Sequence, residues 1–70
     1  MGSSVIKVIE LVGESDRSWE DAVQVAVREA AKTIRGITGV EVLNWTGQCN
    51  HDGDITGFRA DVQIAFQVDN

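Results

Sequence analysis

Apolar and polar residues alternate strictly over residues 58–68. One set consists of Phe58, Ala60, Val62, Ile64, Phe66 and Val68, and the other of Arg59, Asp61, Gln63, Ala65 and Gln67. A period of two predicts a strand with one dry face. The rest of the chain offers one convincing helix to cover that face, so we expect the opposite face of the sheet to stay uncovered within one chain.

Residues 5–12 predict a strand of a different kind. The segment is rich in β-branched residues, is apolar on nearly both faces and stops at Gly13. This pattern is typical of a strand buried on both sides.

An amphipathic helix is predicted after a turn at residues 13–17. Ser18 is its expected N-cap, and Glu20 and Asp21 place negative charge at the positive end of the helix dipole. Apolar residues recur at spacings of three and four at Ala22, Val23, Ala26, Val27, Ala30, Ala31 and Ile34. Gly36 is the expected C-cap.

Residues 40–49 predict a further strand, and residues 50–54 a hairpin connection to the alternating strand. Val40 and Val42 share one face of this strand, and Glu41, Leu43 and Trp45 the other. The helix is expected to cover the apolar set Val40, Val42, Phe58, Val62, Ile64 and Phe66. The uncovered face would then include Trp45 and Leu43, and an exposed apolar patch of this kind marks an interface.

These elements predict an α+β fold of order β-α-β-β. A three-stranded antiparallel sheet would be partly wrapped around one helix, in a single domain over residues 1–70.

Composition narrows how such a small domain is stabilised. A chain of 70 residues buries only about 60% of its unfolded surface, so disulfides, a metal or oligomerisation usually help. Cys49 is the single cysteine and His51 the single histidine, which excludes an internal disulfide and a zinc cluster. Self-association is therefore the expected source of stability.

Charge and hydropathy exclude two classes of partner. A net charge of −5 argues against nucleic acid, which binds basic surfaces. The sequence has no apolar run of membrane-spanning length and no signal peptide pattern, so we expect a cytoplasmic protein.

Four short segments, in their order and spacing, resemble the dodecin family. They are Ile9–Gly13, Trp19–Ala22, Val40–Val42 and Val62–Phe66. The resemblance implies a hollow homo-oligomeric shell of twelve subunits, with helices facing outward and curved sheets inward. It also implies non-catalytic storage or quenching of flavins, which many dodecins bind in pairs stacked between tryptophans.

The flavin contacts of that family are replaced here. Gly39 stands where the family has its stacking tryptophan, and Arg59 follows Phe58 where the family has a glutamine that hydrogen-bonds the flavin. A glycine has no ring to stack on a flavin. Trp45, six residues after Gly39, is expected on the same face by strand periodicity, and Arg59 offers a planar cation.

The candidate cofactor-binding residues are therefore Gly39, Glu41, Trp45 and Arg59. One hypothesis is that they bind a planar or anionic ligand such as riboflavin, FMN or FAD in an altered geometry. The alternative is that Trp45 packs against a neighbouring subunit and that Arg59 pairs with Glu41 or Asp61.

A calcium site and an enzyme active site are weaker hypotheses. Asn50, Asp52 and Asp54 alternate as calcium ligands can, but the glycine and the distant glutamate of an EF-hand are missing. A solvated polar turn is the alternative, although some dodecin-like proteins without the flavin tryptophan have been linked to calcium. Cys49 and His51 lack a third group to orient the histidine, so no catalytic set is predicted.

Overall fold

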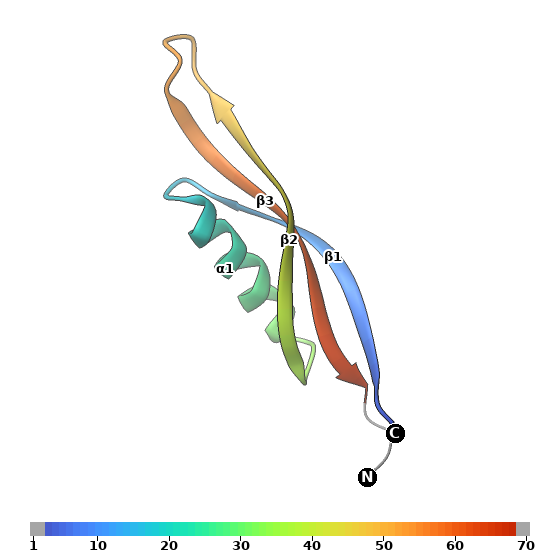
Figure 1. The fold of residues 1–70 in the computed structure, drawn as a ribbon. Coiled ribbons are helices and arrows are strands. Elements are labelled where there is room, and N and C mark those ends of the chain that lie inside the picture. The colour runs from blue at the N-terminus through green and yellow to red at the C-terminus, as the bar shows by residue number, and fades with distance from the viewer. Residues whose placement is uncertain (1–2, 69–70) are drawn as a thin grey trace.

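The computed structural model describes residues 3–68, and its element order is β-α-β-β (Figure 1). The elements are β1 (Val5–Ser15), α1 (Trp19–Ala31), β2 (Ile37–Cys49) and β3 (Ile55–Val68). This confirms the predicted α+β class. All three strands are longer than the patterns indicated, and the ends of the predicted 1–70 domain lie outside the described residues.

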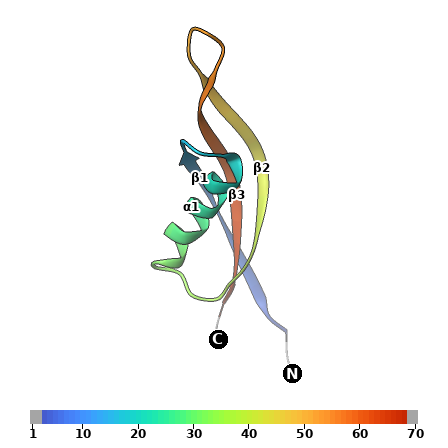
Figure 2. The same cartoon turned by 90° about the vertical axis from the view of Figure 1, so that its left-hand side faces the viewer.

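The alternating strand, β3, lies at the centre of the sheet. The strand order is β1-β3-β2, and both neighbours run antiparallel to β3. Helix α1 lies on one face of this twisted sheet, and the β2–β3 hairpin extends beyond the start of the helix (Figures 1 and 2). Among residues 3–68, no helix or strand covers the other face.

Helix α1 begins as predicted but ends earlier. The backbone N–H of Asp21 donates to Ser18 Oγ at 2.9 Å, so Ser18 is the N-cap. The C-cap is Lys32, so the prediction of Gly36 was wrong. Gly36 instead has a φ of +78° in the connection to β2, and its carbonyl accepts from the backbone N–H of Gln67 at 3.0 Å.

The core is a thin layer of small residues between α1 and β3. It consists of Ala22, Ala26 and Ala30 from the helix and Ala60, Val62 and Ile64 from the strand. Small side chains let the helix lie close to the sheet, as the sequence indicated. Val42 packs against this layer, but Val40 is 44% exposed, so its predicted coverage by the helix was wrong.

Strand β1 is not buried on both sides within one chain, contrary to the prediction. It is an edge strand, and Val8 and Val12 are 55% and 60% exposed. Their side chains point away from the helix because they pair with Ala65 and Asp61, which lie on the uncovered face.

Candidate functional site

The sheet face turned away from α1, called the open face below, is ordered in rows that cross the three strands. Directly paired residues of antiparallel strands point to the same side. One row joins Gly39, Ala65 and Val8, and the next joins Glu41, Gln63 and Glu10. We call these the apolar row and the polar row.

The apolar row is a flat surface of small aliphatic groups. A Cβ atom added to Gly39 would meet nothing within 4 Å, so the space above this glycine is open. Val8 is 55% exposed and borders the same row. This surface can accept a flat apolar group from another molecule.

The polar row brings carboxylates near an unsatisfied oxygen. A hydrogen bond to Asp61, the charge of Asp61 and desolvation together raise the pKa of Glu10 above its ordinary value. Asp61 Oδ1 is buried and has no hydrogen-bond partner among the residues that the structure describes. This part of the open face can therefore hold a proton or a hydrogen-bond donor supplied from outside.

Trp45 does not lie on the face predicted for it. It pairs with Ala60, whereas Gly39 pairs with Ala65, and these two β3 residues point to opposite sides. The cause is a register shift between Val42 and Asn44, where β2 inserts Leu43 as an extra residue. Trp45 is therefore on the helix side of the sheet, where it cannot replace a stacking residue above Gly39.

An aromatic cluster forms around Trp45 on the helix side. The ring centroids of Trp19 and Trp45 are 6.4 Å apart with an interplanar angle of 86°. Phe58 contacts the Trp19 ring at 4.7 Å and 79°. Trp19 Nε1 donates to the carbonyl oxygen of Thr46 at 2.8 Å, which ties the start of α1 to β2.

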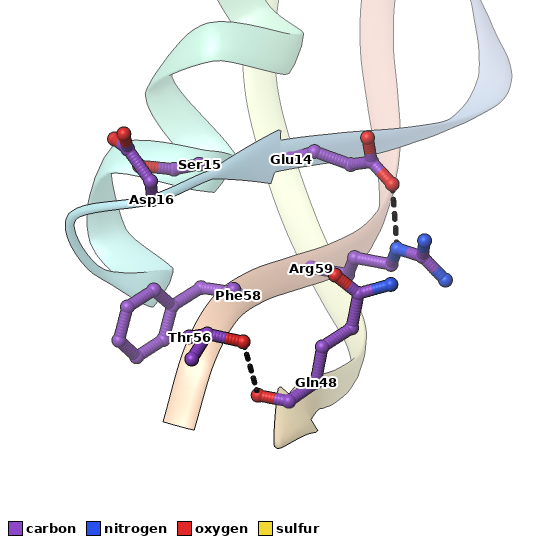
Figure 3. Close-up of a pocket in the computed structure, with 8 residues that line it drawn as sticks. Glu14, Ser15, Asp16, Gln48, Thr56, Phe58 and Arg59 are labelled. Carbon is purple, nitrogen blue, oxygen red and sulfur yellow. Dashed lines mark hydrogen bonds and ion pairs between the residues drawn. The ribbon is translucent and has the colours of Figure 1, made fainter. Parts of the chain in front are cut away.

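Arg59 lies in a polar depression of about 270 Å³ where β1 ends against the hairpin (Figure 3). Its Nε donates to Glu14 Oε2 across the β1–β3 pair. Asp16 and Gln48 also line the depression. Two carboxylates and one guanidinium leave its lining net negative, which disfavours a phosphate.

The prediction that Arg59 pairs with an acidic residue is confirmed, but the predicted partner was wrong. We expected an acid such as Glu41 or Asp61, and the structure places Glu14 there. Glu14 lies directly opposite Arg59 in the register of β1 and β3. The prediction missed Glu14 because the strand at residues 5–12 was thought to stop at Gly13.

The candidate cofactor residues are only partly brought together. Gly39 and Glu41 are neighbours on the open face, opposite Ala65 and Gln63. Arg59 lies six positions before Ala65 on β3, a distance of about 20 Å along the strand. Within one chain, Arg59 therefore cannot contact the same ring as Gly39.

The turn at residues 50–54 is held by its own side chain. Asn50 Oδ1 accepts from the backbone N–H groups of Asp52 and Asp54, both at 3.0 Å. Among residues 3–68 there is no cluster of three or more His, Cys, Asp or Glu that could hold a metal ion. These contacts favour the solvated turn over a calcium site there.

The sequence patterns did not single out Gln63, Glu10 or Asp61 as site residues. Each was visible as a polar residue on a strand, but its neighbours depend on the strand order. The order β1-β3-β2 places Gln63 between the carboxylates of Glu10 and Glu41. A prediction that β1 pairs with β3 would have placed Glu10 beside Gln63 and Asp61.

The fold defines a class: a small subunit with one helix on one sheet face and an open face on the other. The Dodecin family model matches residues 5–69. The chain belongs to the dodecin family. Within the residues described, no helix has the length and apolar character needed to cross a membrane.

Two relatives and one solved structure are similar over nearly the whole chain. Calcium dodecin of Mycobacterium tuberculosis is 32% identical over 65 residues, covering 93% of this chain and 90% of that protein. Dodecin of Thermus thermophilus is 31% identical, with 93% of each covered. A crystal structure of a T. thermophilus dodecin variant has a TM-score of 0.90 at 29% identity, covering 97% of this chain and 100% of that one.

Proposed function

We propose that this chain is a non-catalytic subunit of a homo-oligomeric shell of twelve copies that sequesters a flavin-type ligand on the open face of its sheet. The observation that carries the proposal is the open face itself, which no helix or strand of the described part of the chain covers. The proposed cytoplasmic location rests on the sequence alone.

The shape of the single chain supports assembly. Its radius of gyration is 14.7 Å, whereas a compact domain of this length has about 11 Å. Its accessible surface is 5162 Å², against about 4300 Å² for a typical monomer of this mass. The excess surface includes large apolar side chains, namely Val5, Ile6, Val8, Val12 and Val40. Burial of these groups between copies would supply stability that the thin core lacks.

The two rows of the open face suit a planar heterocycle. A ring can lie flat on Gly39, Ala65 and Val8, because the glycine leaves space above the strand. Its polar edge would then face the polar row, where the Gln63 amide offers both a donor and an acceptor and Glu41 an acceptor. A flavin has such an apolar ring with a hydrogen-bonding edge.

This geometry differs from stacking between tryptophans. Gly39 provides no indole, and Trp45 lies on the other side of the sheet. Arg59 could reach the ligand only from another copy. We therefore expect this face to bind a flavin more weakly than a site with stacking tryptophans, because a flavin ring gains much of its contact energy from aromatic partners.

Native mass spectrometry and a flavin titration test the proposal together. We expect about twelve copies in the mass spectrum and quenching of riboflavin fluorescence at micromolar protein. Gln63→Ala should weaken riboflavin binding by roughly tenfold, since it removes the amide from the polar row. Gln24→Ala, the same substitution on the exposed side of α1, is the matched control. A stable monomer would contradict the assembly, and no quenching would contradict the flavin ligand.

A second candidate ligand is calcium, favoured by the unpaired buried oxygen of Asp61. Carboxylate oxygens suit this hard cation, and Glu10 and Asp61 face each other on the open face. Calcium takes 6–8 oxygens, so water or another copy would have to supply most of them. Calcium dodecin of M. tuberculosis is a relative at 32% identity, which adds support.

Calorimetry with calcium separates this candidate from the flavin. Heat at millimolar calcium that disappears in Asp61→Asn but persists in Asp52→Asn would support a site on the open face. The reverse pattern would place the ion in the hairpin turn. No heat in any variant would exclude both calcium sites.

A further inference from the structure

We propose that Trp19, Trp45 and Glu20 form a binding site for a small quaternary ammonium ion on the helix side of the sheet. These three residues line a cavity of about 340 Å³. The site, called the tryptophan corner below, lies on the opposite side of the sheet from the proposed flavin surface. The proposal of a cation site therefore does not depend on the proposal of a flavin site.

The two indoles stand edge to face beside the cavity. Their planes are 86° apart and their centroids 6.4 Å apart. Both indoles line the cavity, and an ammonium group within about 6 Å of a ring centroid is attracted to the face of that ring. An alkylated ammonium group in the cavity can therefore contact an indole face and lie beside Glu20.

The Trp19 wall of the tryptophan corner is held in place by contacts within the chain. Trp19 is fixed by its hydrogen bond to the Thr46 carbonyl at 2.8 Å and by the edge contact with Phe58. Trp45 is 52% exposed, so one side of its ring remains accessible. A site whose walls are already positioned loses little conformational entropy on binding.

The local charge also favours a cation. Glu20 borders the cavity. The start of a helix carries roughly half a positive charge, which opposes a cation, but Glu20 and Asp21 in the first turn outweigh it. Asp21 is itself engaged by Ser15 Oγ at 2.7 Å, so Glu20 is the carboxylate facing the cavity. The net charge of −5 further attracts cations to the protein.

Intrinsic tryptophan fluorescence of the assembled protein reports directly on this site. The chain has two tryptophans, and both belong to the corner. Titration with choline should change the emission with half-saturation on the order of 1 mM. The uncharged analogue of choline, in which a carbon atom replaces the nitrogen, should bind at least about tenfold more weakly, because it lacks the cation–π attraction.

Two variants distinguish the corner from a general charge effect. Glu20→Gln should weaken choline binding roughly fivefold, as for loss of one exposed ionic contact. Glu29→Gln, at the far end of the same helix, should leave it unchanged. Trp45→Leu, measured by calorimetry, should abolish binding while the circular dichroism spectrum stays the same.

Three results would overturn the proposal. They are equal binding of choline and its uncharged analogue, equal losses in Glu20→Gln and Glu29→Gln, and no choline response in the assembled protein. The last would mean that the corner does not bind a quaternary ammonium ion.

Discussion

Helix α1 and strand β1 approach each other closely at Gly13, where one added methyl group should separate them. Gly13 lies on the helix side of β1. A Cβ atom at this position would be 2.0 Å from the backbone oxygen of Ala22, 3.0 Å from its carbonyl carbon and 3.1 Å from Ala26 Cβ. Ordinary contact begins near 3.4 Å. Gly13→Ala therefore requires the helix to move by about 1.4 Å, since backbone atoms cannot rotate away.

The loss of stability in Gly13→Ala follows from the gap that this movement of the helix opens in the core. Ala22 and Ala26 are two of the six buried core residues, and their short side chains cannot extend to refill a gap. Overpacking a close contact costs typically 1–3 kcal/mol, and a displaced backbone belongs at the upper end. Alanine in a strand recovers about 0.5–1 kcal/mol relative to glycine. We expect a net loss of about 2 kcal/mol in the free energy of unfolding.

Urea unfolding followed by circular dichroism measures this loss, at one fixed subunit concentration because assembly contributes to stability. The midpoint should fall by about 1–2 M urea. Gly39→Ala is the matched control, because its added Cβ meets nothing within 4 Å. Equal midpoints for the two variants would refute the close approach of α1 to β1.

Three further substitutions test other parts of the structure. Glu10→Gln should be at least as stable as the wild type at pH 7. The pKa of Glu10 is raised, so the protonated Glu10 side chain contributes stability below the ordinary value of 4.5. That contribution is lost as the pH rises through the raised pKa. Thermal unfolding from pH 4 to 8 should show this pH dependence in the wild type and not in Glu10→Gln. Ser18→Ala should lose about 1 kcal/mol in urea unfolding, since it removes the N-cap, and an unchanged midpoint would contradict that role. Gly39→Trp should tighten riboflavin binding about tenfold or more by adding a stacking surface, and fluorescence titration showing weaker binding would place the ring elsewhere.

Much of the fold could be predicted because the local patterns agree with one another. The period of two in β3, the spacing of alanines in α1 and the Ser18 cap each depend on nearby residues alone. The packing of small residues between helix and strand then follows from amphipathicity. The end of the helix could not be predicted in the same way. Gly36 has the positive φ expected of a turn glycine, but α1 ends earlier, at Ala31.

The candidate site was harder to predict because it depends on register between distant segments. Trp45 was assigned to the wrong face because period-two counting assumes an unbroken strand, and the extra residue Leu43 reverses the parity. The partner of Arg59 and the surroundings of Gln63 depend on β1 lying beside β3. No local pattern in the sequence encodes either fact.

The inserted Leu43 reverses which residues of β2, odd-numbered or even-numbered, lie on each face of the sheet. Before Leu43, the odd-numbered residues Gly39 and Glu41 lie on the open face, whereas after it the odd-numbered Trp45 lies on the helix side. Each half of β2 therefore contributes residues to both faces of the sheet. Deleting this single residue would remove the bulge but leave Asn44 opposite Asp61 and Trp45 opposite Ala60, so Trp45 would stay on the helix side.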